Sequence, residues 1–162
     1  MTFVVSALPR AAFESLLDLP ESELAQRGVM RRQASAPNTT PCRVTLRDAE
    51  VGETVLLLNY EHQPADTPFR ARHAIFVRED AQDTVFGPGA IPPAFAVRAF
   101  LSLRAFDAEG MMIDAELART EDLETSIERL LDSPEVAYLH AHYAGAGCYA
   151  ARIDRVSRKP CD

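Results

Sequence analysis

The sequence lacks the features of several common protein classes. It has no tryptophan, only three cysteines, and no apolar run long enough to span a bilayer. Residues 1–9 carry no basic segment ahead of their short apolar stretch, so they do not predict a signal peptide. We therefore expect a cytoplasmic protein with no membrane partner.

The cysteines are few and widely separated. Cys42, Cys148 and Cys161 form an odd set, and no two of them have the close spacing of a structural zinc module or a disulfide framework. In the reducing cytoplasm we expect Cys42 and Cys148 to be free thiols.

The charge balance is acidic. Aspartate and glutamate number 24 against 17 lysines and arginines, which gives a net charge of −7. A nucleic-acid partner requires a cationic face, so we expect none. The chain also has no glycine-rich phosphate-binding loop, dinucleotide fingerprint or serine nucleophile elbow, so nothing in it indicates the enzyme classes that carry those motifs.

The pattern of apolar residues predicts a single α+β domain over residues 1–162. This length suffices for a sizeable core, and the hydrophobic share of 47% is ordinary for a globular protein. Expected strands outnumber expected helices, and most connections are short. We therefore expect a mainly antiparallel sheet with two N-terminal helices and one later helix packed on it.

The expected elements follow from periodicity and from turn residues. Strands are predicted for residues 3–8, 29–34, 42–46, 53–60, 70–78, 97–107, 111–118, 136–143 and 147–156, and helices for residues 9–19, 20–28 and 120–131. Glycine-containing turns predict hairpins for the last two pairs of strands. The long stretch 79–96 fits either a flap that packs over a site or a surface loop pinned by its apolar side chains.

The most informative segment is His140-Ala141-His142, which is followed by a glycine-rich turn and Cys148. Side chains alternate along a strand, so both imidazoles leave the same face. We therefore take His140, His142 and Cys148 as the candidate catalytic residues.

Three chemistries fit this segment. The two histidines could hold a metal ion, with Cys42, Cys148 or His62 completing the set, although no third ligand has a fixed offset. Cys148 could instead be a nucleophile with one of the histidines as its base. The segment could also line a polar pocket for a small anion. His73 lies among apolar residues, and we expect it to be a core histidine rather than a ligand.

A second candidate feature is the polar face of the strand over residues 97–107. Its members are Arg98, Phe100, Ser102, Arg104 and Phe106. Guanidinium groups on such a face bind a carboxylate or phosphate, or else cover apolar surface, pair with carboxylates or meet a dimer partner. The predicted ligand-binding residues are Cys42, Arg43, Arg98 and Arg104.

Three segments resemble a known family, in the same order along the chain. They are Pro41-Cys42-Arg43 ahead of a Gly52-Glu53 turn and an apolar strand, Pro68-Phe69-Arg70 leading into Ala74-Ile75-Phe76-Val77, and the paired histidines with Gly147-Cys148. They resemble the bacterial proteins grouped as domain of unknown function 1203. The resemblance covers nearly the whole chain, and it implies a bacterial, single-domain protein and no particular catalytic role.

Two functions from different classes are consistent with these features. The first is a small-molecule-binding or enzymatic domain whose histidine, cysteine and arginine pocket takes a small anionic molecule. The alternative is a non-catalytic interaction protein that uses the arginine and phenylalanine face of residues 97–107 as a homodimer or partner interface. The sequence identifies no particular metal or cofactor.

Overall fold

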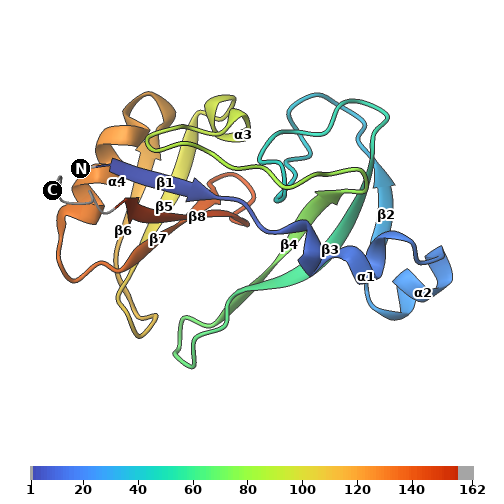
Figure 1. Ribbon diagram of the computed structural model, residues 1–162, viewed down its shortest axis with the longest axis horizontal. Helices are drawn as coiled ribbons and strands as arrows, with labels where there is room; N and C mark the ends of the chain where they lie inside the picture. Colours follow the sequence, from blue (N-terminus) through green and yellow to red (C-terminus); the bar gives the residue numbers. More distant parts are fainter. Residues whose placement is uncertain (1, 157–162) are drawn as a thin grey trace, which may run out of the picture.

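The computed structural model of the protein describes residues 2–156, in which eight strands form two antiparallel sheets (Figure 1). The larger sheet, in the order β1-β8-β7-β5-β6, contains β1 Thr2–Ser6, β8 Tyr149–Val156, β7 Tyr138–Tyr143, β5 Phe100–Phe106 and β6 Met112–Arg119. The smaller sheet, in the order β2-β3-β4, contains β2 Met30–Gln33, β3 Thr54–Gln63 and β4 Ala71–Arg78. The predicted antiparallel α+β class is confirmed, with its strands divided between two sheets.

Both predicted hairpins of the larger sheet are present. β5 pairs antiparallel with β6, and β7 pairs antiparallel with β8. Their turns contain Gly110 with φ 85° and Gly147 with φ 75°, values that glycine adopts freely and that strain other residues. β7 also pairs with β5, and β1 pairs with β8, so the first and last strands lie side by side.

Each sheet has its own hydrophobic core. Leu103 of β5 and Leu139 of β7 are fully buried on one face of the larger sheet. The helix α4 Leu123–Asp132 covers this face and contributes Ile127 and Leu131 to the same core. At the opposite end of the molecule, the short helices of residues 14–26 lie beside the smaller sheet (Figure 1). There Leu24 of the helix α2 Glu21–Gln26 joins the second core.

The first predicted helix, over residues 9–19, is wrong in its extent. The structure has a 3₁₀ turn, η1 Arg10–Ala12, and a single turn, α1 Glu14–Leu17, which are separated at Phe13. Neither piece has a side-chain cap, and isolated short helices are marginal in water. Phe13 is 1% exposed and packs in the second core, so its burial sets the path of the chain here.

The strand predicted over residues 42–46 is not formed. Only Cys42 makes a bridge, to Phe76 of β4. The Leu46 N–H donates to the Cys42 carbonyl at 3.0 Å, and Leu46 takes a φ of 48°, so the segment turns. As a result, Cys42 and Val44 lie in the second core and Leu46 in the first, whereas alternation along a strand would place them on one face. The segment thus places Arg43 between the two sheets, where it is hydrogen-bonded to β4 and β8.

The stretch 79–96 is a loop pinned by its apolar side chains, which is one of the two alternatives considered for it. Phe86 and Ile91 pack against the first core, and Phe95, in the short helix α3 Pro93–Ala96, is fully buried. In the later helical region, a 3₁₀ turn, η2 Thr120–Asp122, precedes α4.

Two further expectations concern cysteines and membrane spans. Cys42 and Cys148 are free thiols, and Cys161 lies outside the described residues. Across residues 2–156, no helix has both the length and the apolar character needed to cross a membrane.

The core assignment predicts a contrast between two leucines. Leu103 is fully buried, whereas Leu117 on the edge strand β6 is 62% exposed. We expect Leu103→Ala to lower the free energy of unfolding by about 2–5 kcal/mol, because it leaves a cavity. Leu117→Ala should change it by less than about 0.5 kcal/mol. Urea denaturation measures both, and equal losses would contradict the assignment.

Candidate functional site

Polar side chains meet at the junction of the two sheets. The Gln63 side chain of β3 donates a hydrogen bond to the Tyr138 hydroxyl of β7 at 2.8 Å. Arg43 Nε donates to the Tyr149 carbonyl of β8 at 2.7 Å. These contacts join segments that are far apart in the sequence, and they flank two groups of side chains: a histidine cluster and an arginine pocket.

A β-bulge brings β3 into the histidine cluster. The pairing of β3 with β4 shifts between Glu61 and Gln63, which leaves His62 as the extra residue. A bulge bends its strand and redirects side chains. His62 and Gln63 are consecutive, yet both are buried, and both reach the larger sheet.

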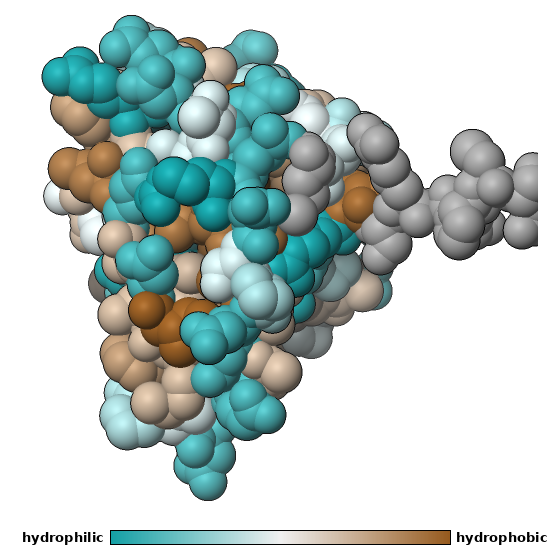
Figure 2. Space-filling model, turned by 90° about the vertical axis from the view of Figure 1, so that its left-hand side faces the viewer, coloured by the Kyte–Doolittle hydropathy of each residue, from teal (hydrophilic) through white to brown (hydrophobic). Residues whose placement is uncertain are grey.

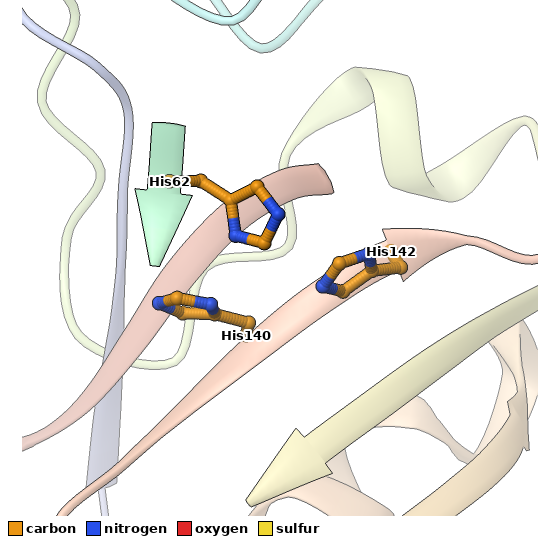
Figure 3. A group of neighbouring side chains, drawn as sticks. All are labelled: His62, His140 and His142. Carbon is orange, nitrogen blue, oxygen red and sulfur yellow. The ribbon is translucent and has the colours of Figure 1, made fainter. Parts of the chain in front are cut away.

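The histidine cluster consists of His62, His73, His140 and His142. His140 and His142 share one face of β7, as predicted, and are only 3% and 0% exposed. Ring nitrogens of these two residues and of His62 all lie within 4.8 Å of one another (Figure 3). Among residues 2–156, no other set of three or more histidine, cysteine, aspartate or glutamate residues is so placed to hold a metal ion.

Hydrogen bonds and aromatic rings fix the cluster. His62 Nε2 lies 2.7 Å from His73 Nδ1, and His142 Nδ1 lies 3.0 Å from the Gly147 carbonyl oxygen. The ring of Tyr149 stacks on that of His62 with centroids 4.7 Å apart. The cluster is therefore ordered by its surroundings rather than free to turn.

Burial keeps these imidazoles uncharged. Desolvation lowers the pKa of His140 and of His142 to about 3, and that of His62 to about 4. The positive charge of Arg104 on β5 lowers all three pKa values further. Near neutral pH each ring therefore carries one proton and one free lone pair.

Arg104 faces this cluster without a partner of its own. It is half-buried, and within the described part of the chain it makes no hydrogen bond or ion pair. Burial lowers its pKa. Arg152 of β8 also faces His140, but it pairs with Asp154 and lies 3.9 Å above the Tyr138 ring.

The arginine pocket is a cavity of about 360 Å³ next to the end of β7. Its polar lining comes from Thr39, Arg43, Arg98, Tyr143 and Cys148, and its apolar lining includes Pro41, Ala74, Phe76 and Phe100. Arg43 is 0% exposed, and its guanidinium donates to the carbonyls of Pro41 and Tyr149 and, at 3.1 Å, to Cys148 Sγ.

Two guanidinium groups flank the Tyr143 ring. Arg43 and Arg98 lie 4.9 and 5.0 Å from its centroid. Arg98 is held by a two-pronged ion pair with Asp48. The Tyr143 hydroxyl is buried and has no hydrogen-bond partner among the described residues, and burial raises its pKa to about 12. The Tyr143 side chain and the two guanidinium groups therefore border one pocket.

The structure distributes the predicted site residues over three places. Arg43, Arg98 and Cys148 line the arginine pocket, whereas His140, His142 and Arg104 meet at the histidine cluster. Cys42 lies in neither group, because its sulfur is buried in the second core and accepts the backbone N–H of Arg78 at 3.3 Å.

The structure does not pair Cys148 with a histidine. In the described residues, the sulfur of Cys148 is hydrogen-bonded to Arg43, and His142 Nδ1 is bonded to the Gly147 carbonyl. The arrangement expected for a thiol nucleophile with an imidazole base is therefore not present.

Sequence reasoning missed two members of the junction. His73 was expected in the core, but it is half-buried and hydrogen-bonded to His62. Tyr143 was not singled out at all. A signal for His73 was available, because β3 and β4 are consecutive strands and their pairing brings His73 opposite Tyr60, close to His62.

Comparison with known proteins identifies one family. The sequence model of the family described as "Protein of unknown function (DUF1203)" matches residues 39–155. The matched range contains every residue of the histidine cluster and of the arginine pocket. No curated protein and no solved structure matches the chain.

The lowered histidine pKa values predict acid sensitivity of the metal-free protein. In the unfolded chain, these histidines become protonated below the ordinary pKa of 6.5. In the folded protein, His140 and His142 stay unprotonated until about pH 3. Their contribution to the free energy of unfolding is therefore complete above pH 6.5 and is lost progressively as the pH is lowered. At pH 5 we expect a loss of about 2 kcal/mol for each of these two residues. Urea unfolding in the presence of a chelator measures this, and equal stability at pH 7 and pH 5 would contradict it.

Proposed function

We propose that this chain, which belongs to the DUF1203 family, binds a small anionic molecule in the arginine pocket. The observation that carries the proposal is the state of Arg43. Its guanidinium is fully buried, and among the described residues it contacts two carbonyls and a thiol but no carboxylate. A buried charge without a counter-charge is costly, and a bound anion would supply one.

The donors of the pocket suit a carboxylate or phosphate group. A guanidinium has five N–H groups, and the three hydrogen bonds of Arg43 leave two of them for a ligand. The Tyr143 hydroxyl is a further donor that lacks a partner. Together they support binding of an anionic head group beside the Tyr143 ring.

The apolar walls of the pocket suit the uncharged part of such a ligand. Pro41, Phe76 and Phe100 line the cavity, whose volume lies at the lower end of the range for small-molecule sites. The ligand class that fits is therefore a small molecule with one anionic group and an aliphatic or aromatic remainder.

Binding is better supported than catalysis. Cys148 is the one candidate nucleophile in the pocket, but nucleophilic catalysis also requires a base within hydrogen-bond reach. In the described part of the chain the partner of Cys148 is Arg43, a cation that donates a hydrogen bond to the sulfur and cannot accept its proton.

The interaction-protein alternative has less support. Of the predicted arginine and phenylalanine face, Phe106 is buried, Arg98 is paired with Asp48, and Phe100 is 37% exposed. On the side of the molecule that carries α4, hydrophobic side chains emerge in small patches separated by hydrophilic ones (Figure 2). A large continuous apolar interface is not visible on this side.

We also propose a bacterial and cytoplasmic setting. The free thiols of Cys42 and Cys148 suit a reducing compartment, and the sequence motifs resemble bacterial proteins.

The test uses titration calorimetry with inorganic phosphate, benzoate and phenyl phosphate as probes and benzyl alcohol as the neutral control. We expect one of the aromatic anions to bind with one molecule per chain and benzyl alcohol to give no signal. Tyr143→Phe should weaken that binding about 3–10-fold, the equivalent of one hydrogen bond. It should not lower the free energy of unfolding, because the lost hydroxyl has no hydrogen-bond partner in the part of the chain that the structure describes.

Tyr138→Phe is the matched control. It also removes one buried phenol hydroxyl, but this hydroxyl accepts the Gln63 hydrogen bond outside the pocket. It should lower the free energy of unfolding by about 1–3 kcal/mol and leave anion affinity unchanged. If none of the three anions binds, or if both variants reduce affinity equally, the proposed function is wrong.

A further inference from the structure

Within residues 2–156, three buried ring nitrogens of the histidine cluster have no hydrogen-bond partner. They are His62 Nδ1, His140 Nδ1 and His142 Nε2. Figure 3 shows the three rings converging, each with a nitrogen turned toward the space between them. A buried polar atom without a partner costs about 1–3 kcal/mol. One bound ion or molecule between the three rings would give all three nitrogens a partner.

The hydrogen bonds of the cluster identify one of these atoms as an acceptor and are consistent with the same role for a second. A carbonyl oxygen only accepts, so His142 Nδ1 must carry the proton that it shares with Gly147, which leaves a lone pair on Nε2. If His62 Nε2 likewise donates to His73 Nδ1, its lone pair lies on Nδ1. In both rings the lone pair lies on the nitrogen that is buried and unpartnered.

This arrangement is the one that metal-binding histidines use. Such histidines donate their other ring N–H to a carbonyl, a carboxylate or another acceptor, which fixes the tautomer and the ring orientation. Here the Gly147 carbonyl is that acceptor for His142, and His73 Nδ1 is the acceptor for His62 in the tautomer that protonates His62 Nε2.

The backbone is also irregular at these residues. His62 is the extra residue of the bulge in β3. The pairing of β7 with β8 shifts between Ala141 and His142, which is a second irregularity. Its extra residue is Ala150 of β8, which lies opposite Ala141 and His142. Bulges recur beside functional sites because they redirect side chains, and the bulge in β3 lies at a member of the converging set.

We propose that His62, His140 and His142 bind one transition-metal ion of the zinc class. Three neutral imidazoles suit Zn²⁺, Cu²⁺, Ni²⁺ or Fe²⁺, and the absence of a carboxylate from the set disfavours Mg²⁺ and Ca²⁺. Four-coordinate zinc with Zn–N bonds near 2.0–2.1 Å separates its ligand nitrogens by about 3.4 Å. The present limit of 4.8 Å requires a modest closure of the three rings.

Three protein ligands leave a fourth position on zinc for water or another ligand. Arg104 faces the cluster and has no hydrogen-bond or ion-pair partner among the described residues. Its positive charge opposes a bare cation and favours an anion, such as hydroxide or chloride, at the fourth position.

The metal site is separate from the arginine pocket. Tyr143 follows His142 on β7, and alternation directs it to the opposite face of the strand. None of the residues that line the pocket belongs to the three ligands. The anion titration and the metal titration can therefore fail independently.

The experiment is a zinc titration of chelator-treated full-length protein, followed by calorimetry and thermal unfolding. We expect one Zn²⁺ per chain and a rise in the melting temperature, because the ion binds only the folded state. His62→Gln, His140→Asn and His142→Asn should each weaken zinc binding more than 100-fold.

His73→Gln and Cys148→Ser are the controls. His73 supports His62 without contributing a ligand, so its loss should weaken zinc binding by only about 10–100-fold. Cys148→Ser should leave the affinity unchanged. Circular dichroism checks that each variant is folded.

A measurement on the unmodified protein covers the case in which the ligand variants do not fold. Long-range ¹H–¹⁵N spectra of the imidazoles should show the lone-pair nitrogens of three histidines shifting on addition of one equivalent of Zn²⁺. The proposal is overturned by the absence of stoichiometric zinc binding, by zinc affinity that survives in folded His142→Asn, or by histidine nitrogens that do not respond to zinc.

Discussion

The structure depends on burying polar side chains between two sheets that each have their own core. Arg43 is central to this junction, because its guanidinium joins the segment after residue 40 to β8 through the carbonyls of Pro41 and Tyr149. Removing one partner from such a network leaves charged or polar atoms buried without hydrogen bonds, which costs more than the bonds themselves contribute. The junction of the two sheets therefore contains buried, hydrogen-bonded polar side chains where apolar side chains could have packed without needing partners.

β7 connects the two proposed sites. Successive side chains of a strand point to opposite faces, so His142 belongs to the histidine cluster while Tyr143 belongs to the arginine pocket. The two sites differ in charge. The histidines are uncharged because burial lowers their pKa values, whereas the pocket holds the permanent charges of Arg43 and Arg98. The first therefore suits a metal cation, and the second suits an anion.

The sequence predicted those parts of the fold that local patterns determine. Gly110 and Gly147 mark the two hairpin turns, and the spacing of His140 and His142 placed both rings on one face. The parts that it missed depend on tertiary packing. Nothing local reveals that His62 is the extra residue of a bulge, and the left-handed φ of Leu46 arises where the chain passes from one core to the other.

Anomalous X-ray diffraction shows whether the converging histidines form a metal site. Crystals grown with one equivalent of Zn²⁺ would be measured on both sides of the zinc absorption edge. We predict a single strong anomalous difference peak within bonding distance of His62 Nδ1, His140 Nδ1 and His142 Nε2. A map with no peak between these three nitrogens, or with zinc bound only elsewhere on the chain, would contradict the account.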